Sequence, residues 1–211
     1  MKNFFTLTLC FLTLSLTAQS PVVGDYYGGG VVFWVNPDDN MQGLVCDINN
    51  LGSFVWCNSS EQCGTSTGVL SGMNNTNLML FTCSESVAEE ETAAHNCVNS
   101  NAQGYSDWFI PSKDELNLIY LNSGEINTQS LANGGTLLGG EYWSSSEHMS
   151  GGSNPFWSAW RQTFWNNGFQ GTSGKSDQKS VRAVKSYSFV LTPGCTDPTA
   201  LNYDPLATVD D

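Results

Sequence analysis

The chain has 211 residues, of which 20 are acidic and 7 are Lys or Arg, so its formal net charge is −13 at pH 7. Nucleic-acid phosphates need a basic face, so this balance excludes a nucleic-acid-binding protein and argues equally against an anionic membrane partner. The acidity is compatible with calcium, whose ligands are oxygen atoms, and equally with simple solubility outside the cell.

The chain begins with a pattern typical of a secretory signal peptide. Lys2 forms a short positive region, an apolar core runs from Phe4 to Leu16, and cleavage is expected after Ala18. The apolar core is too short for a transmembrane helix, and no later stretch approaches the ~20 apolar residues of a span. We therefore expect an exported protein with a signal peptide at 1–18 and no transmembrane segment.

Six cysteines follow the signal peptide. An even number of cysteines in an exported protein favours disulfides over a metal site. Cys57 and Cys63 enclose a short polar loop and form the first expected pair. Cys83 and Cys97 bracket an expected helix and form the second.

A hairpin is expected at the start of the domain. Gly28–Gly30 fits a turn, and the β-branched and aromatic run 31–35 is typical of a buried strand. Turn-forming residues fill 36–40, so the run 43–46 returns as the second strand. Residues 53–56 are a candidate for a short third strand.

Helices are expected in the middle of the chain, after a polar loop at 58–75. The first is expected from Asn75 to Phe81. A capping box of Ser86 and Glu89 opens a second helix, which runs to about Val98.

The segment 104–120 carries the clearest local signals. Residues 108–110 predict a short strand, and Ser112 with Glu115 predicts a capping box at the start of a helix. The charged residues here, Asp107 among them, suggest a charged site. Capping and dipole chemistry nevertheless explain those at the helix start without any ligand.

The second half of the domain is rich in loops and aromatic strands. A loop is expected over 123–140, and Asn166–Gly168 is a turn. Strands are expected at 141–147, 156–160, 163–165 and 180–185.

Several of these motifs, in this order, resemble one known family. The run GYSDWFIPSKDELNLIY at 104–120, the opening hairpin followed by a Trp, YWSS at 142–145 and VRAV at 181–184 are similar to the Lcl C-terminal domain family. That family is named after the end domain of a bacterial collagen-like surface adhesin, and the resemblance covers roughly residues 24–187. It implies an α+β domain of C-type lectin-like fold, loop-rich and disulfide-stabilised, with two or three helices on a small antiparallel sheet.

The resemblance extends remotely to formylglycine-generating enzymes, whose catalytic cysteines lie near the end of the domain. This chain has no cysteine between Cys97 and Cys195, so that activity does not carry over. A serine-hydrolase site is disfavoured too, because Ser144–Ser146, Glu147 and His148 are strand neighbours that alternate between faces. We expect no enzyme; a degenerate enzyme of either kind is the alternative.

Recognition is then the expected function. Sugar rings bind on flat aromatic faces flanked by amides and carboxylates, and the chain has 7 Trp, 7 Tyr and 11 Phe. The candidate ligand-binding residues are Glu147, Trp160, Arg161, Trp165, Asn166, Asn167 and Gln170. The triplet 165–167 resembles the Trp-Asn-Asp calcium triplet of C-type lectins, but its Asp is replaced. We expect an extracellular glycan, matrix ligand or surface polymer to bind at a bacterial cell surface; core packing of the aromatics and a purely structural module are the alternatives.

The composition changes at the C-terminal tail, residues 192–211. Two Asp-Pro pairs punctuate it, and it resembles short Cys-bounded acidic modules of exported bacterial proteins, without their second Cys. Cys195 can therefore pair beyond this sequence, and a Cys46–Cys195 disulfide is not expected. The residues that could gather around Ca²⁺ are Asp197, Asn202, Asp204, Asp210 and Asp211, although their spacing is not that of an EF-hand. An Asp/Pro-rich linker without metal is the alternative.

Overall fold

The computed structural model describes residues 19–57, 59, 61–83, 92–149, 156–205 and 207–210. Pro21–Phe189 form one compact domain, and the segment from Val190 on belongs to a separate unit. The expected signal peptide 1–18 and the capping box expected at Ser86 lie outside the described residues. None of the described helices is long and apolar enough to cross a membrane.

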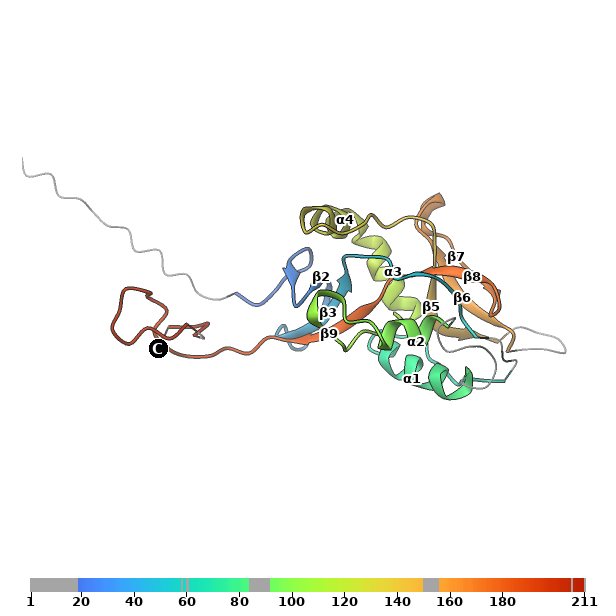
Figure 1. The fold of residues 1–211 in the computed structure, drawn as a ribbon, viewed down its shortest axis with the longest axis horizontal. Coiled ribbons are helices and arrows are strands. Elements are labelled where there is room, and N and C mark those ends of the chain that lie inside the picture. Colours follow the sequence, from blue (N-terminus) through green and yellow to red (C-terminus); the bar gives the residue numbers. More distant parts are fainter. Residues whose placement is uncertain are drawn as a thin grey trace, which may run out of the picture. The chain divides into compact units, whose positions relative to one another are not determined.

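The domain combines helices with two sheets (Figure 1). The strands are β1 (Tyr26–Tyr27), β2 (Gly30–Val35), β3 (Gln42–Asp47), β4 (Gly52–Val55), β5 (Glu141–His148), β6 (Ser158–Thr163), β7 (Gln170–Gly174), β8 (Gln178–Val181) and β9 (Val184–Ser188). The α-helices are α1 (Gly72–Cys83), α2 (Ala93–Val98), α3 (Lys113–Leu121) and α4 (Ser123–Ala132). The sheets have the orders β1-β2-β3-β9 and β4-β8-β5-β6-β7. The α+β class is confirmed, with four α-helices and two sheets in the described residues instead of two or three helices on one sheet.

The first sheet contains the predicted hairpin. β2 pairs antiparallel with β3, and β3 pairs antiparallel with β9, so the end of the domain returns to its start. The β1–β2 turn passes through Gly28 and Gly29, whose φ angles are 56° and 83°. Two positive φ angles are what a type I′ hairpin turn requires, and glycine adopts them without strain. In Figure 1, α1 and α2 lie on one side of the sheets and α4 on the other.

The predicted helix start at Ser112 is confirmed. Ser112 Oγ accepts the Glu115 N–H at 3.2 Å, and Glu115 Oε2 accepts the Ser112 N–H at 2.7 Å. Glu115 Oε1 also accepts the Gly72 N–H at 3.3 Å, so one carboxylate joins α3 to the start of α1. Burial raises the pKa of this carboxyl, and the hydrogen bonds that it accepts partly offset the effect.

The strand expected at 108–110 and the loop expected at 123–140 are wrong in extent. In place of the strand at 108–110, the structure has an isolated bridge between Phe109 and Val184. The first part of the second is the helix α4, whose buried residues Ile126 and Ser130 are four positions apart. The helical face carries few apolar residues, so its periodicity is hard to detect in the sequence.

Two predicted strands of the second half also have different bounds. The strand expected at 163–165 is absent, because β6 ends at Thr163 and the chain turns. Thr163 Oγ1 donates to Trp165 O at 2.9 Å, and the Thr163 N–H donates to Phe169 O at 3.0 Å, which closes the turn. The strand expected at 180–185 is divided between β8 and β9, which belong to different sheets.

A disulfide is confirmed, but the expected pairs are wrong. Cys57 is bonded to Cys83, 26 residues away, whereas Cys63 and Cys97 are free and buried. The reason is spatial: α1 ends at Cys83 and brings its Cα within 5.5 Å of the Cys57 Cα. Proximity in the sequence does not determine which cysteines reach bonding distance.

Asp47 gives a prediction about stability. Its side chain is fully buried, and its Oδ2 has no hydrogen-bond partner among the described residues. Burial raises the pKa of this carboxyl, so the folded protein binds the proton more tightly than the unfolded chain. The contribution of Asp47 to stability is therefore greatest below the unfolded pKa of about 4 and falls as the pH rises through the folded pKa.

We predict that Asp47→Asn raises the free energy of unfolding at pH 7 and flattens its fall with pH. Urea unfolding at a series of pH values measures both. The exposed turn residue Asp38 offers a matched control, since Asp38→Asn makes the same substitution at the surface of the domain. An unchanged slope in Asp47→Asn contradicts the prediction.

Candidate functional site

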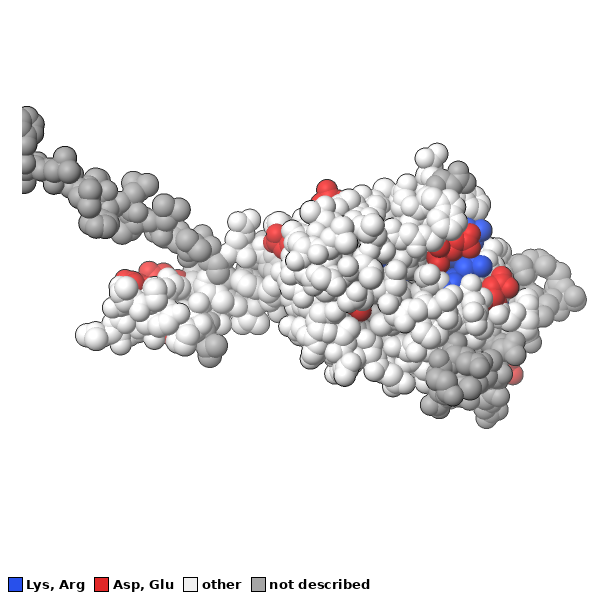
Figure 2. Space-filling view, turned by 45° about the horizontal axis from the view of Figure 1, so that its top comes forward, with Lys and Arg blue, Asp and Glu red and all other residues white. Residues whose placement is uncertain are grey.

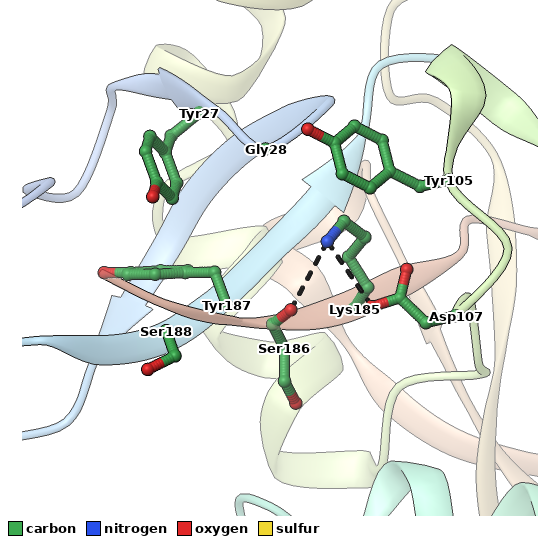
Figure 3. Close-up of a pocket in the computed structure, with 8 residues that line it drawn as sticks. All are labelled: Tyr27, Gly28, Tyr105, Asp107, Lys185, Ser186, Tyr187 and Ser188. Carbon is green, nitrogen blue, oxygen red and sulfur yellow. Dashed lines mark hydrogen bonds and ion pairs between the residues drawn. The ribbon is translucent and has the colours of Figure 1, made fainter. Parts of the chain in front are cut away.

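A hollow of about 410 Å³ lies where three distant segments of the domain meet. Its walls come from the β1–β2 hairpin, from the segment after the short 3-10 helix η2 (Ala102–Gly104), and from β9. We call it the tyrosine hollow (Figure 3), and its lining residues are Tyr27, Gly28, Tyr105, Asp107, Lys185, Ser186, Tyr187 and Ser188.

Backbone pairing positions these side chains. The Phe109 N–H donates to Val184 O at 2.8 Å, and the Val184 N–H donates to Phe109 O at 2.9 Å. This reciprocal bridge holds the segment that carries Asp107 beside the start of β9. Lys185 follows at once, and it shares a face of β9 with Tyr187 because alternate residues of a strand point the same way.

Gly29 gives Tyr105 its place in the wall. A Cβ at Gly29 would lie 2.6 Å from Tyr105 Cδ2, closer than real Cβ contacts allow. The ring therefore packs against bare backbone at the hairpin turn. The glycine-rich entry thus sets both the turn and the wall of the hollow.

The Lys185 ammonium is nearly buried but loosely held. Its side chain is 6% exposed, and Nζ lies 3.5 Å from Asp107 Oδ2 and 3.4 Å from Ser186 O. Charge-assisted hydrogen bonds are usually about 2.7–2.9 Å long. Nζ also lies 4.2 Å from the centre of the Tyr105 ring. Figure 3 shows it between Tyr105 on one side and Tyr27 and Tyr187 on the other.

Two tyrosines complete the wall. The rings of Tyr27 and Tyr187 meet edge to face, with centroids 5.2 Å apart. Burial raises the pKa of the Tyr187 phenol, so it stays neutral at physiological pH. The Tyr187 hydroxyl is buried and has no hydrogen-bond partner among the described residues.

The ligand-binding residues predicted in the second half are placed differently from one another. Trp165 is exposed (55%) beside the 3-10 turn η3 (Asn166–Gly168), and Phe169 after the turn is exposed as well. Asn167 is exposed and has a φ of 59° within the turn, whereas the side chain of Asn166 lies outside the described parts.

Trp160 and Gln170 make contacts within the domain. Lys113 Nζ lies 5.0 Å from the centre of the Trp160 ring, and the ring of His148 meets Trp160 edge to face with centroids 5.0 Å apart. Gln170 Nε2 donates to the Lys113 carbonyl at 3.1 Å. These contacts connect β6 and β7 to the start of α3.

Arg161 belongs to a charged network. Its Nη1 lies 3.2 Å from Glu141 Oε1, and Lys179 Nζ lies 3.4 Å from Glu141 Oε2. The guanidinium also lies 5.6 Å from the centre of the Phe169 ring. Figure 2 shows basic atoms beside acidic ones near the β6–β8 end of the domain, while most of that face is uncharged. This network has two cations for one carboxylate, so each of its charges has a partner but one positive charge is in excess.

Glu147 is a buried structural residue. Its Oε1 lies 2.5 Å from Lys175 Nζ, and the two side chains are 6% and 0% exposed. The Cys63 N–H donates to both carboxylate oxygens, and Lys175 Nζ also lies 4.8 Å from the centre of the Trp56 ring. Glu147 is thus engaged inside the domain, whereas Trp165 is exposed.

The described acidic residues of the tail bond within their own unit. Asp197 Oδ1 accepts hydrogen bonds from the Thr199 N–H and hydroxyl, which lower the pKa of Asp197. Asp210 Oδ1 accepts the Thr196 N–H at 3.1 Å. No group of three or more His, Cys, Asp or Glu side chains among the described residues is placed to hold a metal ion. Of the calcium ligands predicted in 197–211, Asp197, Asp204 and Asp210 therefore do not form such a group, and Asp211 lies outside the described residues.

Sequence reasoning missed the tyrosine hollow because its parts are distant in the chain. Asp107 was noted as a charged residue of 104–120, but its partner Lys185 is 78 positions away. The family motifs are the only part of the sequence that could have indicated this site. The motif at 104–120 contains Tyr105 and Asp107, and the motif at 181–184 is followed directly by Lys185.

The buried ion pair generates a prediction. Glu147→Ala should destabilise the domain by about 3–5 kcal/mol, because it leaves the Lys175 charge buried without its partner. The double variant Glu147→Met with Lys175→Met should recover much of this loss. Chemical denaturation measures both, and a change below about 1 kcal/mol in Glu147→Ala would show that Glu147 is not a structural residue.

One comparison with known proteins covers the motifs at 104–120, 142–145 and 181–184, but not the opening hairpin. A search of curated proteins returned no match. A family model described as the Lcl C-terminal domain matches residues 47–185, which include β4–β8, all four α-helices, and both Asp107 and Lys185. The chain belongs to the Lcl C-terminal domain family.

Proposed function

We propose that the domain is a non-enzymatic extracellular binding module that recognises a neutral saccharide in the tyrosine hollow. One observation carries the proposal: the Lys185 ammonium is nearly buried, yet its oxygen contacts are long, at 3.4 Å and 3.5 Å. A charged group that is nearly buried and has no short hydrogen bond is costly, and the Lys185 side chain is only 6% exposed. A ligand oxygen in the hollow would supply the short hydrogen bond.

The groups around Lys185 suit adjacent sugar hydroxyls. The ammonium can only donate, and the carboxylate of Asp107, 52% exposed, can only accept. Of two neighbouring sugar hydroxyls, one can accept a hydrogen bond from Lys185 while the other donates one to Asp107. The ring of Tyr27 and the exposed part of the Tyr105 ring add apolar surface for the C–H side of a sugar ring, as in other concave ligand sites.

Charge favours a neutral ligand over a polyanion. The Lys185 and Asp107 charges cancel, so the hollow offers no surplus positive charge. The whole chain has a net charge of −13, which repels an anionic polymer at a distance. Hydroxyl recognition is therefore better supported than binding to sulfate or carboxylate groups.

Several contacts support binding over hydrolysis. Ser144 Oγ donates to the Trp160 carbonyl at 2.9 Å, and Ser146 Oγ donates to the Ser66 carbonyl at 2.7 Å. His148 Nδ1 lies 3.2 Å from the hydroxyl of Ser158 on the neighbouring strand. Ser144 and Ser146 are thus occupied by carbonyls, and Ser158, the serine beside His148, donates to the His148 carbonyl at 3.2 Å, whereas a nucleophile must donate to its base.

Family membership suggests a surface or adhesion-type module, which fits this proposal. The N-terminal pattern at 1–18 fits export, and a saccharide ligand outside the cell fits both. We therefore place the protein outside a bacterial cell or at its surface.

Glycan-array binding with the full chain tests the proposal. Tyr105→Ala and Lys185→Met should each weaken binding to neutral glycans about tenfold or more, through loss of the stacking face or of the donor. Trp165→Ala, an exposed aromatic outside the hollow, is the matched control and should bind as the unmodified chain does.

Unfolding curves must first show that each variant is folded. Binding lost in Trp165→Ala and kept in both hollow variants would move the site to the second half of the domain. Binding restricted to sulfated polymers would overturn the neutral-ligand proposal.

A further inference from the structure

A second hollow lies next to the first. It has a volume of about 200 Å³. Its lining residues are Met73, Thr76, Asn77, Val98, Ser106, Asp107, Trp108 and Phe109, and we call it the methionine hollow. It lies between α1, the end of α2 and the segment 106–109.

Asp107 belongs to both hollows. The segment around it lines both hollows: Tyr105 lines the first, whereas Trp108 and Phe109 line the second. The Phe109–Val184 bridge fixes this segment to β9. A ligand whose hydroxyls meet Asp107 from the tyrosine hollow therefore has the methionine hollow as its neighbour.

The second hollow has a different chemistry from the first. Met73 is 45% exposed at the start of α1, and Val98 ends α2, so the mouth has apolar walls. The Thr76 hydroxyl is already engaged, because it donates to Gly72 O at 2.8 Å and accepts the Ile110 N–H at 3.0 Å. The exposed amide of Asn77 adds one donor and one acceptor at the rim.

We infer that the two hollows are adjoining subsites for one ligand, an oligosaccharide that contains an N-acylated amino sugar. The inference rests on the proposed function. The sugar hydroxyls meet Lys185 and Asp107, and the acyl methyl enters the methionine hollow. The acyl amide pairs with the side-chain amide of Asn77, whose donor and acceptor match its carbonyl and N–H. A free hydroxyl in place of the acylamino group would leave the apolar walls without a partner.

Two oligosaccharide series separate this inference from the proposal on which it rests. N,N′,N″-triacetylchitotriose, called chitotriose below, has the same β-linked backbone as cellotriose. The two sugars differ only at C2 of each ring, where chitotriose has an acetamido group and cellotriose has a hydroxyl. Calorimetric titration of the full chain should show about tenfold tighter binding of chitotriose, from methyl burial and one amide pairing.

Variants of the second hollow test where the preference arises. Met73→Ser and Val98→Asn should each bring chitotriose affinity down towards that of cellotriose. Leu131→Ser replaces another exposed apolar helix residue, on α4, and should keep the preference of the unmodified chain.

Each outcome has a definite meaning. Equal affinities for the two sugars overturn the subsite inference and leave the proposed function standing. A preference that survives both Met73→Ser and Val98→Asn also overturns it. If neither sugar binds nor any other neutral glycan, the proposed function fails and the inference fails with it.

Discussion

The reciprocal hydrogen bonds between Phe109 and Val184 are the constraint on which the site depends. They join a segment in the middle of the chain to the last strand of the domain. β9 in turn pairs with β3, and β3 with β2, so the same sheet carries the hairpin that supplies Tyr27. Without this bridge, Asp107 and Lys185 would have no reason to approach one another.

The three most buried long cations of the domain show why Lys185 is unusual. Lys175 has a carboxylate oxygen at 2.5 Å, and the fully buried Arg182 donates to Asn50 Oδ1, Thr136 Oγ1 and Thr136 O at distances of 2.9–3.2 Å. Both therefore have hydrogen-bond or ion-pair contacts of 3.2 Å or less, although Arg182 Nε has no partner among the described residues. Lys185 is almost as buried, yet its oxygen contacts are 3.4–3.5 Å long and it lines a hollow. The contrast within one molecule distinguishes Lys185 from the structural charges and supports the proposed ligand site.

Local chemistry made part of this fold predictable. The capping box at Ser112 depends on residues three positions apart, and the β2–β3 hairpin depends on a turn between two apolar runs. Both were predictable because all the residues that determine them are close in the sequence. The resemblance to the Lcl C-terminal domain family was also readable, since it rests on ordered motifs.

The features that failed are those set by tertiary contacts. The bond between Cys57 and Cys83 depends on where α1 ends in space. The buried face of α4 includes the small polar residue Ser130, so the sequence shows little of the apolar periodicity that predicts a helix. The candidate site shifted for the same reason. An exposed Trp165 looks like a binding residue in the sequence, but only the fold reveals that Asp107 and Lys185 share one cavity.

The central claim is that a neutral saccharide binds in the tyrosine hollow, where it contacts Tyr105 and Lys185. Backbone amide shifts of the full chain, followed by NMR during titration with a neutral oligosaccharide, test it most directly. The account predicts that the largest saturable shifts occur at Tyr27, Tyr105, Asp107 and Lys185. Saturable shifts confined to the surroundings of Trp165 and Phe169, with the hollow unchanged, would contradict it.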